Sequence, residues 1–258
     1  MRLMKRILSA AAVLALSASL LVGCSSGTAS SVPVSASSAA ESTVSSVEET
    51  ASSAVDENEA AAAQLLNDLT GSYQELWPVI LADEYKQTWL DVCTALVGED
   101  NAEAAFEKLS SMVTGDVYGE DAVKAYANGG GAYFCGFTNS LAILTFDGET
   151  STISGTDKDG NVLFSHTYHY IGMEPVHGLY EFESDDADSG EFTYFFLAPD
   201  TSAETYHIEF RYGSDAEALS QYDTGEYAYW LASGISTDCD QTMIDNCIEL
   251  FCTENLAG

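Results

Sequence analysis

Positive charge is what this sequence has least of. Lysine and arginine together number 8 against 41 aspartates and glutamates, so the formal net charge is −33. Three of the eight lie within the first six residues, and the remaining five are Lys86, Lys108, Lys124, Lys158 and Arg211. Such a chain repels phosphate backbones and attracts cations. Nucleic acid is therefore excluded as a partner, and the acidity fits cation capture or, more simply, solubility outside the cell.

Aromatic residues are absent from Ser25 to about Ala62, and this stretch has a single proline. It consists mainly of Ser, Ala, Thr, Val and Glu, which cannot bury enough apolar surface to fold. We predict a disordered tether over residues 24–62. As a flexible coil it would reach roughly 31 to 37 Å.

The first 24 residues have the pattern of a bacterial lipoprotein signal. Arg2, Lys5 and Arg6 precede an apolar stretch over residues 7–22, which is short for a transmembrane span, and Gly23-Cys24 follows directly. We predict a signal peptide over residues 1–23 and a lipid on Cys24. The mature protein would then be anchored to the cell membrane on its extracytoplasmic face.

Cysteines are few and do not form a metal or redox motif. Besides Cys24 there are five, Cys93, Cys135, Cys239, Cys247 and Cys252, and no CxxC occurs. An odd number cannot pair completely within one chain. Cys247 and Cys252 are five residues apart on a predicted helix, so their sulfurs should point to different faces. We interpret the cysteines as core or disulfide residues.

Residues 63–258 are long enough for one domain. Up to residue 128 the apolar spacing predicts helices over 63–70, 84–97 and 102–113, with Asn101 as an N-cap. Gly129, Gly130 and Gly131 interrupt this pattern. A last helix is predicted over 238–253, with Ser236 and Thr237 as candidate caps.

Between these helical regions the sequence predicts strands. The runs are rich in aromatic and β-branched residues and cover 132–137, 141–146, 151–154, 162–171, 176–183, 191–197 and 205–212. Asp147-Gly148 and Asp159-Gly160 are typical of hairpin turns with positive φ. Seven or eight such strands predict an antiparallel barrel or sandwich.

The strand over 205–212 alternates strictly. Tyr206, Ile208, Phe210 and Tyr212 share one face, whereas Thr205, His207, Glu209 and Arg211 share the other. The polar row is either a solvated outer face or a row that looks into a barrel mouth. In the second case its imidazole and carboxylate would bind a divalent metal.

Several segments resemble the ZinT-type zinc-binding proteins, a calycin-like domain also found at the C-terminus of AdcA-type zinc-uptake lipoproteins. The segments, in chain order, are Gly71-Ser72-Tyr73-Gln74-Glu75-Leu76-Trp77-Pro78, Tyr168-His169-Tyr170-Ile171-Gly172, Gly178-Leu179-Tyr180-Glu181-Phe182-Glu183, His207-Ile208-Glu209-Phe210 and Gly213-Ser214-Asp215-Ala216-Glu217-Ala218-Leu219. The first is similar to the family's opening helical segment. The resemblance implies a calycin or lipocalin-like antiparallel β-barrel with an N-terminal helical segment and a C-terminal helix.

The resemblance also implies a zinc site, which this sequence only partly retains. The family uses one histidine in an S-D-H turn and two in an H-x-H strand. Here the strand reads Thr205-Tyr206-His207, so His207 matches one ligand, and the turn falls near Asp200, the nearest oxygen ligand. Losing one of the imidazoles that bind the metal directly should weaken metal binding at least tenfold.

The remaining histidines are His166, His169 and His177. His166 and His169 point to opposite faces of a strand, so at most one of them can join His207. A structural or surface role is the simpler interpretation for all three. The acidic run from Asp185 to Gly190 lacks the closing glutamate of a calcium loop and reads as a solvated turn.

Three classes of function remain. The first is a metal-binding module that holds zinc without turnover and passes it to a metal ABC importer. The second is a metal-free barrel that binds an apolar or glycan ligand or a protein partner. The third, an enzyme, is not predicted, because no Ser-His-Asp set, phosphate loop or Cys-His pair stands out.

Overall fold

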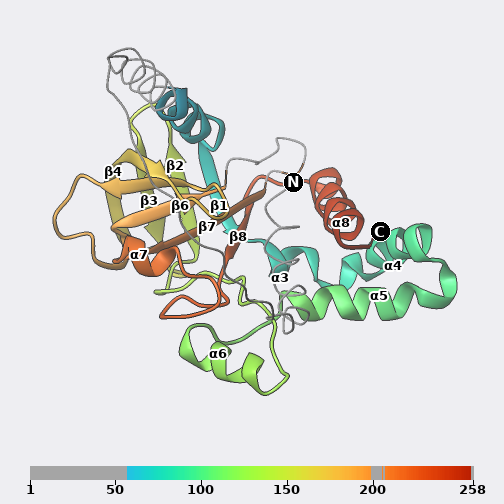
Figure 1. The fold of residues 1–258 in the computed structure, drawn as a ribbon. Coiled ribbons are helices and arrows are strands. Elements are labelled where there is room, and N and C mark those ends of the chain that lie inside the picture. Colours follow the sequence, from blue (N-terminus) through green and yellow to red (C-terminus); the bar gives the residue numbers. More distant parts are fainter. Residues whose placement is uncertain (1–56, 199–204, 206, 257–258) are drawn as a thin grey trace, which may run out of the picture.

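Eight antiparallel strands close into a barrel in the computed structural model, which describes residues 57–198, 205 and 207–256 (Figure 1). Each strand pairs with its neighbour in sequence, and β1 pairs with β8 to complete the barrel. The strands are β1 (Gly71–Glu75), β2 (Ile143–Asp147), β3 (Thr152–Thr156), β4 (Val162–Met173), β5 (Tyr180–Ser184), β6 (Tyr194–Leu197), β7 (His207–Gly213) and β8 (Ala232–Ser236). The predicted calycin-like antiparallel barrel with helices at both ends is confirmed.

The strand predictions hold for six of the eight strands, with shifted ends. β1 and β8 were missed, because each is short and β1 runs directly into the helix α3 (Leu76–Ile80). The strand predicted over 132–137 is wrong. That segment only makes isolated bridges, from Phe134 to Thr114 and to Trp230.

Aromatic side chains fill the inside of the barrel. Phe195 pairs with Tyr212 across β6 and β7, and residues opposite each other share a face. Phe164 of β4 and Phe195 of β6 are separated by a whole strand, yet their rings lie 5.9 Å apart. Such a contact is favoured on the concave side of a curved sheet. Phe146, Phe182 and Phe210 complete this interior and are at most 1% exposed.

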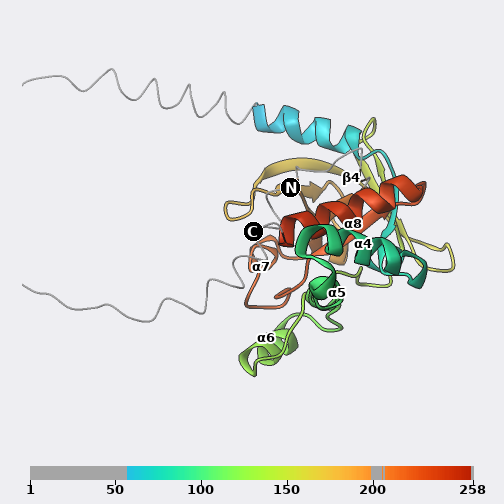
Figure 2. The ribbon, with the colours of Figure 1, turned by 90° about the vertical axis from the view of Figure 1, so that its right-hand side faces the viewer.

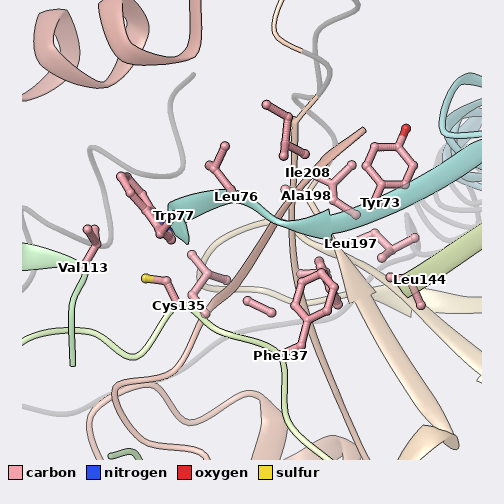
Figure 3. Packing of buried hydrophobic residues seen from close by; sticks show 14 of the residues in the cluster. Tyr73, Leu76, Trp77, Val113, Cys135, Phe137, Leu144, Leu197, Ala198 and Ile208 are labelled. Carbon is pink, nitrogen blue, oxygen red and sulfur yellow. The ribbon is translucent and has the colours of Figure 1, made fainter. Parts of the chain in front are cut away.

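A helical layer covers one side of the barrel. It contains α3, the 3-10 helix η1 (Asp83–Tyr85), α4 (Lys86–Val97), α5 (Glu99–Met112) and α8 (Gln241–Leu256). Figures 1 and 2 both show α8 beside α4, and α3 contacts both α8 and β8. Trp89, which is fully buried, packs its ring against Phe251 of α8 at 6.0 Å. Figure 3 shows Trp77 of α3 near Val113 and Cys135.

The shorter helices are α6 (Glu120–Ala127), α7 (Ala216–Leu219) and the 3-10 turn η2 (Gly190–Phe192). Residues 57–68 are also helical, so residues 57–62, which we assigned to the tether, are part of a helix and Ala62 is buried. None of the described helices is long and apolar enough to cross a membrane.

Two helix starts differ from the prediction. α5 begins at Glu99 after Gly98, and Asn101 lies inside the helix, where its side chain donates to the Val97 carbonyl at 3.1 Å. At α8, the carboxylate of Asp240 accepts from the backbone N–H of Met243 at 3.0 Å. Asp240 therefore caps the helix in place of Ser236 and Thr237.

The two predicted glycine turns have different causes. Gly160 has φ +81°, as expected for a hairpin turn. Gly148 does not have positive φ. A Cβ there would lie 2.4 Å from the Cα of Asn67, so glycine is needed because the end of the helix over 57–68 passes close to the β2–β3 turn.

Candidate metal site

The polar row of β7 lies on the outside of the barrel. Its neighbours in the same strand, Phe210 and Tyr212, face Phe195 in the aromatic interior. The row His207, Glu209 and Arg211 must therefore point outward. It is not solvated, however, because Glu209 is 6% exposed and Arg211 is fully buried. Neither sequence interpretation describes the row: it is an outer face, but helices and a loop cover it.

His207 and Glu209 line a small cavity between β7 and the helices α3 and α8. The cavity has a volume of about 20 Å³. Its polar side chains come from two elements: His207 and Glu209 from β7, Cys247 and Glu254 from α8. Its apolar walls are Leu76, Trp77, Ile80, Leu250 and Phe251. Space for one water molecule or one ion is available, but an organic ligand would not fit.

Thr205 orients the imidazole of His207. The threonine hydroxyl and Nδ1 of His207 are 2.5 Å apart, and Thr205 itself is 5% exposed. The backbone carbonyl of Thr205 accepts from the thiol of Cys247 at 3.0 Å. These contacts join the start of β7 to α8 on the side of the cavity.

Cys247 is a hydrogen-bond donor in this arrangement. Burial raises the pKa of its thiol to about 12, so the sulfur is protonated at neutral pH. Burial and then the charge of Glu209 also raise the pKa of the Cys135 thiol. The donors best suited to a divalent metal are therefore the imidazole of His207 and the carboxylates of Glu209 and Glu254.

Among the residues that the structure describes, no group of three or more His, Cys, Asp or Glu side chains stands ready to hold a metal ion. His207, Glu209 and Glu254 share one cavity but would have to rotate toward a common centre. Asp200 and Cys24, the other predicted site residues, lie outside the described residues.

Arg211 occupies the other end of the row and has a structural role. Its guanidinium donates to the carbonyls of Leu219, Gln221 and Tyr227, and it lies over the ring of Tyr222 at 4.2 Å. These bonds hold the segment after α7 against the barrel. A buried positive charge at this end also disfavours a cation there.

The other histidines pair with acidic residues away from the cavity. His166 Nδ1 lies 2.7 Å from Asp186, and His169 Nδ1 lies 2.7 Å from Asp185. His166 pairs across the sheet with the interior residue Ile153, whereas His169 pairs with Glu183 on the outside, so the predicted opposite faces are confirmed. His177 stacks on Tyr222 at 3.7 Å.

Sequence reasoning missed Cys247 and Glu254 as neighbours of His207. They are seven residues apart on α8, and this spacing places them on one helix face. That shared face was readable from the sequence. Nothing local indicated that the face would pack on β7.

The barrel has the closed, sequential eight-stranded topology of calycin-like proteins. No family model and no curated protein matches the chain. Among solved structures it is similar to the Zn(II)-bound ZinT-like domain of Streptococcus pneumoniae AdcA, with 15% identity, a TM-score of 0.44, and coverage of 70% of this chain and 87% of that one.

It is also similar to Zn(II)-bound AdcA from the same organism, with 14% identity, a TM-score of 0.41, and coverage of 71% of this chain and 34% of that one. The sequence segments described above resemble this same ZinT-like domain.

Proposed function

We propose that this chain is a membrane-anchored, extracytoplasmic divalent-metal binding protein that captures zinc. The observation that carries the proposal is that His207, Glu209 and Glu254 line one cavity of about 20 Å³. Imidazole and carboxylate are zinc ligands, and an ion of that kind needs no larger space. The protein would hold the ion without chemical turnover and release it to a metal importer in the membrane.

The charge of the chain supports capture of a cation. With 41 acidic and 8 basic side chains, the surface raises the local concentration of divalent ions. Beyond Glu209, the next outward position of β7 is Arg211, whose three carbonyl bonds keep it directed at the loop after α7. The carboxylates of Glu209 and Glu254 would both interact favourably with an ion beside His207.

The anchor follows from the sequence of the first 24 residues, which lie outside the described residues. A lipid on Cys24 and a tether would keep the barrel near the membrane surface, where an importer could receive the ion. Labelling cells with a palmitate analogue tests this part. Loss of the label in Cys24→Ser is the expected result, and an unlabelled parent chain would contradict it.

A zinc titration of the full chain, purified in mild detergent under reducing conditions, tests the metal site. We expect one zinc per chain at micromolar affinity or better, about −8 kcal/mol. His207→Ala should weaken binding at least tenfold. The matched control is His169→Ala, because this imidazole also contacts a carboxylate but lies outside the cavity.

If both variants lose the same amount of zinc affinity, or if binding is millimolar and unchanged by His207→Ala, zinc binds only nonspecifically to the acidic surface. In that case the alternative function, a barrel domain with an organic ligand or protein partner, gains weight. Two surface depressions of about 350 and 490 Å³ flank Glu75 and Pro78 and have the size that such ligands need. Analysis of molecules that co-purify with the chain would then be the next measurement.

A further inference from the structure

The interface between α4 and α8 contains two cysteines in direct contact. The sulfur atoms of Cys93 and Cys252 are 4.0 Å apart, and both side chains are fully buried. Cys93 lies one turn after Trp89 on α4, and Cys252 follows Phe251 on α8. The rings of Trp89 and Phe251 pack against each other, so the two helices are held together next to the sulfurs.

The other described cysteines have different surroundings. The thiol of Cys247 donates to the Thr205 carbonyl, and that of Cys135 lies 3.9 Å from the Tyr133 carbonyl. Cys247 thus points to the barrel while Cys252 points to α4, as the five-residue spacing predicted. Closing the gap between Cys93 and Cys252 to a bond length of about 2.05 Å requires a side-chain rotation and a small approach of the helices.

We propose that Cys93 and Cys252 form a disulfide that joins α4 to α8 in the mature protein. The proposal rests on the extracytoplasmic location given above, where disulfides form and persist. The oxidant is a small or protein disulfide: one thiol forms a mixed disulfide with it, and the second thiol displaces the carrier. Two thiols become one disulfide, and the oxidant is reduced to two thiols.

Burial decides when this bond forms. Cys93 and Cys252 are fully buried once α8 has docked, so an oxidant reaches their sulfurs only while the two helices are apart. Exchange requires direct attack of one sulfur on another. The bond therefore forms while α8 docks on α4 during folding.

The disulfide would act on the candidate metal site through α8. It links positions 159 residues apart and ties the C-terminal helix to the helical layer. The same helix supplies Glu254 and Cys247 to the cavity with His207. Fixing α8 therefore fixes one wall of the cavity.

Refolding of the full chain with glutathione disulfide, followed by alkylation and peptide mapping without reduction, tests the pair. We expect two thiols to be consumed and a peptide that joins Cys93 to Cys252. The melting temperature should lie about 5 to 15 °C above that of the protein reduced with dithiothreitol.

In Cys93→Ala, no pair of thiols should be lost during refolding with glutathione disulfide. The melting temperature of this variant should be the same with and without reductant. Cys239→Ala is the matched control, in which two thiols should still be consumed, because Cys239 precedes α8 and is only half-buried. Full alkylation of both Cys93 and Cys252 after refolding, or a cross-link between other cysteines, would overturn the proposal. Since zinc is titrated on the reduced protein, failure of metal binding would leave the disulfide result unaffected.

Discussion

The two faces of β7 are both buried, but one is apolar and lies inside the barrel, whereas the other is polar and lies under helices and a loop. The inner face carries Phe210 and Tyr212 and packs against Phe195 in an aromatic interior. The outer face carries His207, Glu209 and Arg211 under a layer of helices and loop. Apolar packing stabilises the barrel from within, while the polar groups that we propose to bind an ion lie outside it, between β7 and the helices.

The largest expected effect comes from opening the inner face. Phe195 is fully buried and its ring contacts Phe164, Phe210 and Tyr212. Phe195→Ala should lower the free energy of unfolding by about 3 to 5 kcal/mol, because a cavity replaces the ring. Urea denaturation measures this loss. Zinc affinity of the folded fraction should stay unchanged, and a parallel loss of zinc binding would show that the two faces are not independent.

Removing the buried cation should have the next largest effect. Arg211→Met would leave the carbonyls of Leu219, Gln221 and Tyr227 without this donor, at a cost of about 2 to 4 kcal/mol in unfolding free energy. Protection of the amides in residues 220–229 should fall in hydrogen exchange. Stability equal to that of the parent would mean that the hydrogen bonds of Arg211 are not needed to hold the loop after α7.

Glu174 offers a smaller effect with a defined pH dependence. Burial alone would raise the pKa of its carboxyl, but hydrogen bonds from His177 and from the backbone N–H of Val176 outweigh burial and the pKa is lowered. A lowered pKa gives stability that is present above the unfolded value of about 4.3 and is lost as the pH falls through the folded value.

Glu174→Gln should therefore cost about 1 to 2 kcal/mol at pH 7 and less at acid pH. Thermal melts between pH 7 and pH 3 measure this. Parallel stability curves for parent and variant would contradict the assignment. Glu149→Gln, which changes an exposed carboxylate, is the control.

The smallest expected effect on stability comes from a change on the outer face alone. Thr205→Val removes the hydroxyl that contacts Nδ1 of His207 and should weaken zinc binding about tenfold, because such partners orient metal-binding imidazoles. Unfolding free energy should change by about 1 kcal/mol or less. Zinc affinity equal to that of the parent would show that Thr205 does not position the ligand.

Much of the fold was readable from local patterns. Runs of aromatic and β-branched residues located six strands, and the apolar spacing located the helices over 84–97, 102–113 and 238–253. β1 and β8 were not predicted, because their neighbours in sequence are helical or irregular. Their pairing, Tyr73 with Ser236, also joins two segments that are far apart in the chain. Such contacts leave little trace in a short window of sequence.

The sequence by itself determined that His207 and Glu209 share a face, that Phe210 and Tyr212 share the opposite one, and that Cys247 and Cys252 point in different directions. These follow from the repeat of a strand and of a helix. Only the tertiary structure decided which face of β7 is inside and which residues cover the other. Alternation distinguishes two faces but cannot assign the interior, because here α3, α8 and the loop after α7 also bury the polar face.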